Sequence, residues 1–182
     1  MCGLTGFIHQ DRISNDLDIK SVLESMTETL IPRGPDSFGH YIDNKIALGH
    51  RRLKIIDLSD SGAQPMQIRD NGAVIAYNGE VYNFQSLRDE LVSAGHNFRG
   101  ESDTEVILHS YDEWGFDGLK RLEGIFSFAL WDPSIQRLIL IRDRLGIKPI
   151  FYAESKMGLA FGSEIKSLLK AGGVDTSIND QA

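Results

Sequence analysis

The chain has 182 residues, of which 41% are hydrophobic and 25% charged, a composition typical of one globular domain with its own core. Its formal net charge of -7 argues against binding to nucleic acid or to an anionic membrane, because both select basic surfaces, and no apolar run is long enough to cross a bilayer. The single cysteine cannot form an internal disulfide and nothing resembles a secretory signal, so we expect a cytoplasmic protein.

Hydrophobic periodicity predicts strands connected by short turns, with a few helices between them. Strands are expected over 4–8, 39–42, 46–53, 73–77, 125–131, 137–142, 149–153 and 159–162. Helices are expected over 16–30, 84–94 and 163–170, with another that begins at Asp103 and fades by Gly115. Strands that follow one another through short turns indicate antiparallel sheets with helices on the outer faces, so the sequence predicts one α+β domain.

The N-terminus carries the first candidate for chemistry. Cys2 is the only cysteine and directly follows Met1. If Met1 is removed, Cys2 bears a thiol and a free α-amine whose ordinary pKa values differ by less than about one unit. One residue could then serve as both nucleophile and base. The alternative is an ordinary frayed terminus without function.

Asn78-Gly79 follows an apolar run and is first of all a turn signal. Its functional alternative is an oxyanion hole, in which the Asn78 amide and the Gly79 N–H donate to a developing negative charge.

Charged residues at three places in the sequence could bind charged groups of a ligand. Of the adjacent Arg51 and Arg52, only one can point into a given site, where its guanidinium would grip a carboxylate. Asp103 begins a helix whose start is predicted by a capping box formed by Ser102 and Glu105, and it could receive an ammonium group. Glu80 has the same ambiguity. Each of these residues could equally be an ordinary surface or capping group.

The five histidines show no spacing typical of metal ligands, so no metal site is expected. The phosphate-binding and nucleophile-elbow motifs common in other enzymes are also missing from the sequence.

Eight short motifs, in one order and covering nearly the whole chain, resemble the class II glutamine amidotransferase domain. This domain is an N-terminal-nucleophile hydrolase, and the run around Arg52 is most similar to the asparagine-synthetase (glutamine-hydrolysing) branch. The motifs are Met1-Cys2-Gly3 with Gly6-Phe7, Arg33-Gly34-Pro35-Asp36, Gly49-His50-Arg51-Arg52-Leu53 with Ile55-Ile56-Asp57, Gln64-Pro65-Met66, Tyr77-Asn78-Gly79-Glu80-Val81-Tyr82-Asn83, Ser102-Asp103-Thr104-Glu105, Arg142-Asp143-Arg144-Leu145-Gly146 with Pro149, and Phe161-Gly162-Ser163-Glu164.

The resemblance implies a four-layer αββα sandwich of two mostly antiparallel sheets. It further implies that residues 1–182 form a glutaminase domain that hydrolyses L-glutamine. The implied catalytic residues are Cys2, Asn78 and Gly79, and the implied substrate-binding residues are Arg52, Ile55, Ile56, Glu80 and Asp103.

In this branch the glutaminase domain delivers ammonia to an ATP-dependent synthetase domain, which this chain does not contain. We therefore expect a synthetase domain or subunit as partner, no cofactor in the glutaminase domain itself, and ATP and Mg²⁺ only in the synthetase. Aspartate is the default ammonia acceptor, and self-association into a homo-oligomer stays open. Two alternatives also stay open: a catalytically silent regulatory or docking module whose amine is capped by Met1, and a hydrolase of another amide.

Overall fold

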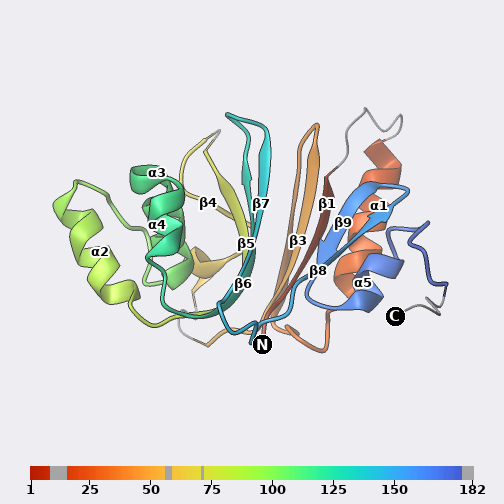
Figure 1. Ribbon diagram of the computed structural model, residues 1–182, viewed down its shortest axis with the longest axis horizontal. Coiled ribbons are helices and arrows are strands. Elements are labelled where there is room, and N and C mark those ends of the chain that lie inside the picture. Colours follow the sequence, from red (N-terminus) through yellow and green to blue (C-terminus); the bar gives the residue numbers. More distant parts are fainter. Residues whose placement is uncertain (9–15, 56–58, 71, 178–182) are drawn as a thin grey trace.

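Two antiparallel sheets stack face to face between two layers of helices in the computed structural model, which describes residues 1–8, 16–55, 59–70 and 72–177 (Figure 1). The five-stranded sheet has the order β2-β3-β1-β9-β8 and is built from β1 (Gly3–Ile8), β2 (Ser37–Ile42), β3 (Ile46–Arg52), β8 (Phe151–Ser155) and β9 (Gly158–Gly162). The four-stranded sheet has the order β4-β5-β6-β7 and is built from β4 (Met66–Gln67), β5 (Val74–Val81), β6 (Gly124–Asp132) and β7 (Arg137–Arg142).

The helices divide between the two outer faces. α1 (Asp16–Glu28) and α5 (Ile165–Leu169) lie outside the five-stranded sheet, whereas α2 (Phe84–Ser93), α3 (Asp103–Trp114) and α4 (Phe116–Lys120) lie outside the four-stranded sheet (Figure 1). A short 3₁₀ helix, η1 (Asp60–Gly62), follows β3. The predicted αββα sandwich is confirmed. In the described part of the chain, no helix is both long and apolar enough to span a membrane.

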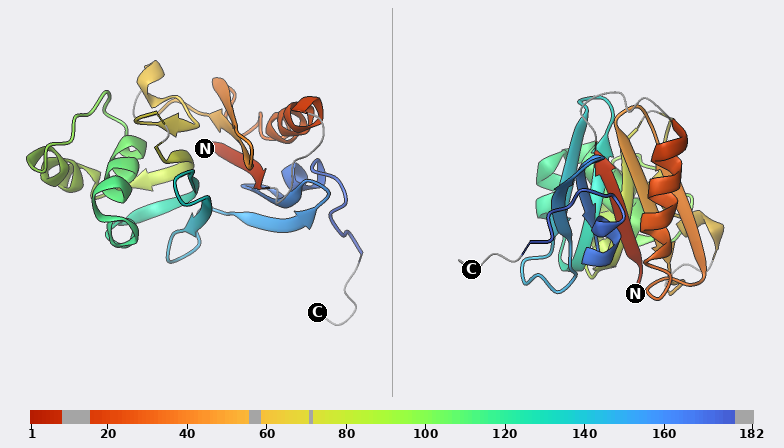
Figure 2. Two further views of the ribbon diagram at one scale, coloured as in Figure 1. Left: turned by 90° about the horizontal axis from the view of Figure 1, so that it is seen from above. Right: turned by 90° about the vertical axis from the view of Figure 1, so that its right-hand side faces the viewer.

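Strand alternation builds one apolar layer between the sheets and one under each helical layer. In β5, Val74 and Ala76 pack between the sheets, whereas Ile75 and Tyr77 pack against α2 and α3. The same alternation directs Asn78 toward the space between the sheets. β1 is the central strand of the five-stranded sheet, and the N-terminus before it lies at one end of the sandwich, midway between the two helical layers (Figure 1 and Figure 2).

One expected strand boundary is wrong. The run 73–77 does not end at Asn78-Gly79, because β5 continues through Val81, with Asn78 opposite Ser127 and Gly79 opposite Phe126 of β6. Position 79 requires a glycine because the backbone of β6 passes very close to it: a Cβ there would lie 2.3 Å from the Ile125 carbonyl oxygen. Pairing with β6 therefore overrides the local turn preference of Asn-Gly.

Other boundaries differ more modestly. β4 and α4, which are only two and five residues long, are not predicted by the sequence pattern, and α1 and α5 are shorter than that pattern predicts. Short elements carry too few residues to show a period, and their ends are decided by the elements they pack against.

Candidate active site

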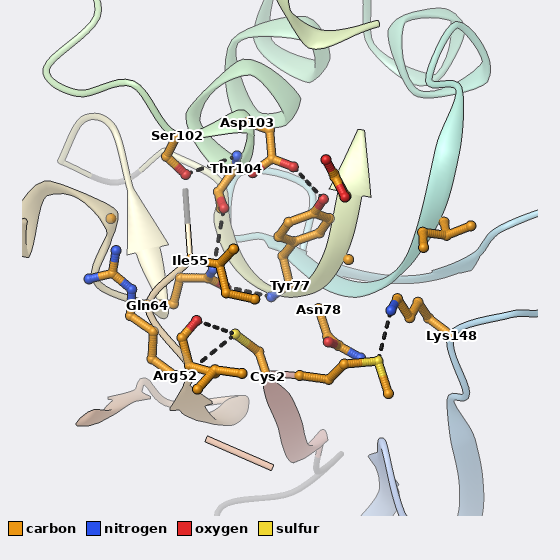
Figure 3. Close-up of a pocket in the computed structure, with 16 residues that line it drawn as sticks. Cys2, Arg52, Ile55, Gln64, Tyr77, Asn78, Ser102, Asp103, Thr104 and Lys148 are labelled. Atoms are coloured by element: carbon orange, nitrogen blue, oxygen red, sulfur yellow. Dashed lines mark hydrogen bonds between the residues drawn. The ribbon is translucent and has the colours of Figure 1, made fainter. Parts of the chain in front are cut away.

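A pocket opens where the N-terminus meets β3, β5 and the start of α3 (Figure 3). Seven of the eight predicted site residues line it: Cys2, Arg52, Ile55, Asn78, Gly79, Glu80 and Asp103. The eighth, Ile56, lies outside the described residues. Residues separated by up to 101 positions in the sequence are thus brought to one cavity.

Cys2 is held in place on both sides. Its Sγ accepts a hydrogen bond from Leu53 N at 3.3 Å, and its carbonyl oxygen accepts one from Arg33 Nε at 2.9 Å. Burial raises the pKa of the Cys2 thiol, while the Leu53 bond and the charges of Arg52 and Arg33 lower it. Because burial is the largest effect, the neutral thiol is favoured, and forming the thiolate requires a base nearby.

Asn78 supplies a donor without an acceptor. Its side chain is 2% exposed, and no described residue accepts a hydrogen bond from its Nδ2. The amide lies between Cys2 and Lys148 in Figure 3. An unpaired buried N–H costs about 1–3 kcal/mol, so an orphan donor in a pocket indicates that something else is meant to bind there.

The two arginines of β3 point to opposite sides, as strand alternation predicts. Arg52 is 6% exposed and lines the pocket, where its Nη1 donates to Ser59 O at 2.7 Å. Arg51 instead lies over the Phe38 ring, 4.9 Å from its centroid, and donates to Thr27 O.

Asp103 is only 4% exposed, and it is fixed by its neighbours. Its Oδ2 accepts from Tyr77 Oη at 2.6 Å and from Val81 N at 3.0 Å. Burial raises the pKa of the Asp103 carboxyl, and the Tyr77 hydrogen bond is the largest of the effects that oppose this rise. Burial likewise raises the pKa of Tyr77 well above its ordinary value, so its hydroxyl stays a donor. Glu80 and Ile55, in contrast, are exposed at the rim.

The predicted capping box at the start of α3 is only half right. Ser102 Oγ accepts from Thr104 N at 3.1 Å, which is the expected cap. The Glu105 carboxylate, however, accepts from Arg99 N and Gly100 N, at 2.8 and 3.0 Å. The Glu105 carboxylate therefore holds the loop that precedes the helix.

Comparison with known proteins identifies the family. Residues 1–182 match the family model described as a glutamine amidotransferase domain. The chain belongs to this family. A Bacillus subtilis (strain 168) protein named asparagine synthetase (glutamine-hydrolyzing) 3 is 44% identical over 171 residues, which are 93% of this chain and 27% of that protein. Asparagine synthetase (glutamine-hydrolyzing) 2 of the same strain is 42% identical over 168 residues, 92% of this chain and 22% of that protein.

The chain thus spans about a quarter of the length of these curated relatives. Among solved structures, glutamine phosphoribosylpyrophosphate amidotransferase from B. subtilis superposes with a TM-score of 0.76 over 96% of this chain and 44% of that chain. At 18% sequence identity, this likeness shows the fold alone. The family and the fold class predicted from the sequence are confirmed.

The amidotransferase pocket contains residues that the sequence analysis did not assign. Gln64 Oε1 accepts from Tyr77 N at 2.6 Å, and Gln64 Nε2 donates to Thr104 Oγ1 at 3.2 Å, so Gln64 joins β5 to α3. Tyr77 and Lys148 also line the pocket. Tyr77 stands beside Asn78 in the sequence, and that adjacency was a usable signal. Lys148 lies 146 residues from Cys2 in the sequence, and no local pattern signals that the two residues share a pocket.

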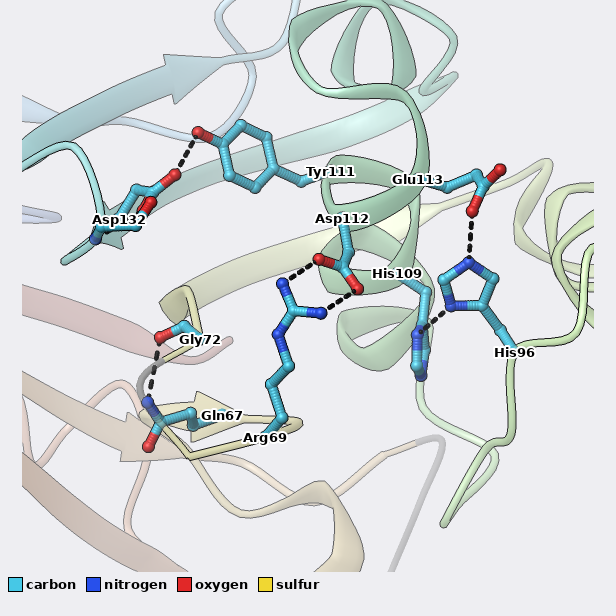
Figure 4. Close-up of polar contacts among 10 residues, drawn as sticks. Gln67, Arg69, Gly72, His96, His109, Tyr111, Asp112, Glu113 and Asp132 are labelled. Atoms are coloured by element: carbon cyan, nitrogen blue, oxygen red, sulfur yellow. Dashed lines mark hydrogen bonds and ion pairs between the residues drawn. The ribbon is translucent and has the colours of Figure 1, made fainter.

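Two of the five histidines, which show no metal-ligand spacing in the sequence, lie in contact in the structure. His96 Nδ1 and His109 Nδ1 are 2.8 Å apart, and His96 Nε2 lies 2.8 Å from Glu113 Oε2 (Figure 4). Their separation of 13 residues hid this contact from spacing rules. Within the described residues, no group of three or more histidines, cysteines and carboxylates could hold a metal ion. His9 lies outside those residues.

Proposed function

We propose that this amidotransferase domain hydrolyses L-glutamine to glutamate and ammonia, with Cys2 as the nucleophile. The observation that carries the proposal is the orphan Nδ2 of Asn78, buried in the same pocket as Cys2. A donor held there without an acceptor suits an oxyanion that exists only during the reaction.

The chemistry requires that Met1 be removed, because Met1 acylates the amine of Cys2 and itself lines the pocket. In the processed protein, the Cys2 thiol gives its proton to its own α-amine, and the thiolate attacks the carboxamide carbon of glutamine. Asn78 Nδ2 and Gly79 N–H stabilise the oxyanion. The ammonium then gives its proton to the departing nitrogen, which leaves as ammonia from a γ-glutamyl thioester. Water, activated by the same amine, releases glutamate.

Charge complementarity supports an amino-acid substrate. Arg52 would bind the α-carboxylate of glutamine, helped by backbone groups near Ile55 and Ile56. Asp103 and Glu80 would bind its α-ammonium. Arg52 and Asp103 line the same pocket and carry opposite charges, and a simple acyl amide would leave both without a partner.

The names of the asparagine synthetases to which the chain is similar support the next step, in which ammonia passes to an ATP-dependent synthetase domain or subunit, with aspartate as the acceptor. The thiol and amine of Cys2 suffice for the hydrolysis, so we propose that the domain itself uses no cofactor and that ATP and Mg²⁺ serve only the synthetase. A cytoplasmic location is part of this proposal.

The test is ammonia release by the processed protein. Glutamine should be hydrolysed, simple acyl amides should not, and a folded Cys2→Ala variant should be inactive. A Cys2→Ala protein that still releases ammonia from glutamine would refute the assignment. Mass measurement of the N-terminus separates the alternative, since a protein that retains Met1 in cells fits the silent docking module.

A further inference from the structure

Lys148 enters the pocket from a rigid turn that follows β7. Asp143 organises this turn by accepting hydrogen bonds from Leu145 N, Ile147 N and Lys148 N at 3.1, 3.0 and 2.9 Å. The turn is also tied to the sheet, because Asp143 N donates to Phe126 O at 2.7 Å. The backbone of Lys148 is thereby fixed at the wall of the cavity.

Lys148 is buried, and its side chain has no counter-ion in the part of the chain that the structure describes. Only 9% of the residue is exposed, and within the described residues no carboxylate lies within ion-pair distance of its Nζ. The contact found for Nζ is Met1 Sδ, at 2.8 Å. Burying an uncompensated ammonium is costly, so its retention at this point calls for a role in the site.

Removal of Met1 changes what Lys148 faces. Met1 Sδ is five bonds from the Cys2 nitrogen, so it lies at most roughly 6 Å from that atom. Lys148 Nζ, which contacts Sδ, therefore lies within roughly 9 Å of the nitrogen that becomes the α-amine. When Met1 leaves, its side chain vacates the space between the two nitrogens. Arg33 Nε, which donates to Cys2 O at 2.9 Å, also lies close to this nitrogen, and Arg52 lines the same pocket. The carboxylates that line the pocket are those of Glu80 and Asp103, and they act on an amine in the opposite direction.

We propose that Lys148 is a positioning residue that acts through the Cys2 α-amine, holding that amine in the neutral form that accepts the thiol proton. The inference rests on the proposed function and adds a residue to it. A second positive charge disfavours an ammonium, and a separation of this size in a partly desolvated site shifts a titration by roughly one pH unit.

The experiment compares processed Lys148→Met and Lys148→Arg proteins in glutamine hydrolysis across pH 5 to 10. In Lys148→Met, the acidic limb of the kcat/KM profile should move up by roughly one pH unit, giving a loss of up to about tenfold at low pH that disappears at high pH. Lys148→Arg should keep the wild-type profile. An unshifted acidic limb in Lys148→Met, or an equal loss at every pH, overturns the proposal.

A direct titration keeps the test independent of turnover. In processed Cys2→Ala protein no thiol titrates beside the amine, so the pH dependence of its acylation rate reports the amine alone. The pKa should lie below the value of about 7.7–8.0 for a free α-amine. A value at or above this range overturns the proposal, even if Lys148→Met does not fold. Inactivity of Cys2→Ala tests the proposed function separately, and an active enzyme with an unshifted profile overturns only the role of Lys148.

Discussion

Replacing Tyr77 by Phe removes one oxygen atom from the pocket and tests how Asp103 is tuned. The lost bond, from Tyr77 Oη to Asp103 Oδ2 at 2.6 Å, is buried and charge-assisted. Such bonds contribute about 1.5–3 kcal/mol, so the free energy of unfolding should fall by about that amount. Val81 N still donates to Asp103, which should keep its position approximately unchanged.

The same deletion should weaken glutamine binding in a pH-dependent way. Burial already raises the pKa of Asp103 and the Tyr77 bond opposes this rise, so the variant carboxyl should titrate at higher pH. Each loss of about 1.4 kcal/mol by the ionised form raises the pKa of the carboxyl by about one unit, and this raises KM by up to about tenfold, the full factor being reached only where the carboxyl is protonated in both proteins. The rise in KM should be largest at pH 6 and smallest at pH 8. The value of kcat should change little, because Asp103 would contact the α-ammonium and not the reacting amide.

Initial rates of ammonia release at pH 6, 7 and 8 measure this effect. Tyr111→Phe is the matched control, because Tyr111 Oη donates to Asp132 Oδ2 at 2.8 Å outside the pocket (Figure 4). It should cost stability and leave KM unchanged. The reasoning is refuted if Tyr77→Phe leaves KM at pH 6 unaltered, or if Tyr111→Phe raises it equally.

Two further changes probe the oxyanion donor and the buried histidine. Asn78→Ala should lower kcat by about 10²–10³-fold with little change in KM, because one oxyanion donor contributes about 2.7–4 kcal/mol in the transition state. The control is Asn83→Ala, which removes an amide that donates to Arg121 O and should leave kcat unaltered. Equal losses of kcat in both variants would contradict the assignment of Asn78. Burial lowers the pKa of His50 to about 4, so between pH 6.5 and 4 the unfolded chain binds a proton that the native protein excludes, and stability falls as pH falls. Urea unfolding at pH 7.5 and 4.5 should give a loss of roughly 2–3 kcal/mol from this residue, and a His50→Gln variant with the same pH dependence as wild type would show that another group is responsible.

The sequence by itself determined the chemistry available at the N-terminus and the class of fold. That Cys2 directly follows Met1 is set by the covalent chain and does not depend on folding. The expectation of antiparallel sheets followed from strand runs joined by short turns, and strand alternation separated Arg52 from Arg51. Such signals are local: they depend on residues within a few positions of one another, where periodicity and turn chemistry act.

Only the tertiary structure decided where these groups meet. Asn78 became an inward-facing donor because β5 pairs with β6 beyond the point at which local preference would end the strand. Tyr77 reaches Asp103 across 26 positions, and Lys148 reaches Met1 across 147, through contacts that no short window of sequence contains. Long-range pairing and burial fix the partner of each polar group, and with it the pKa and the donor capacity on which the chemistry of the pocket depends.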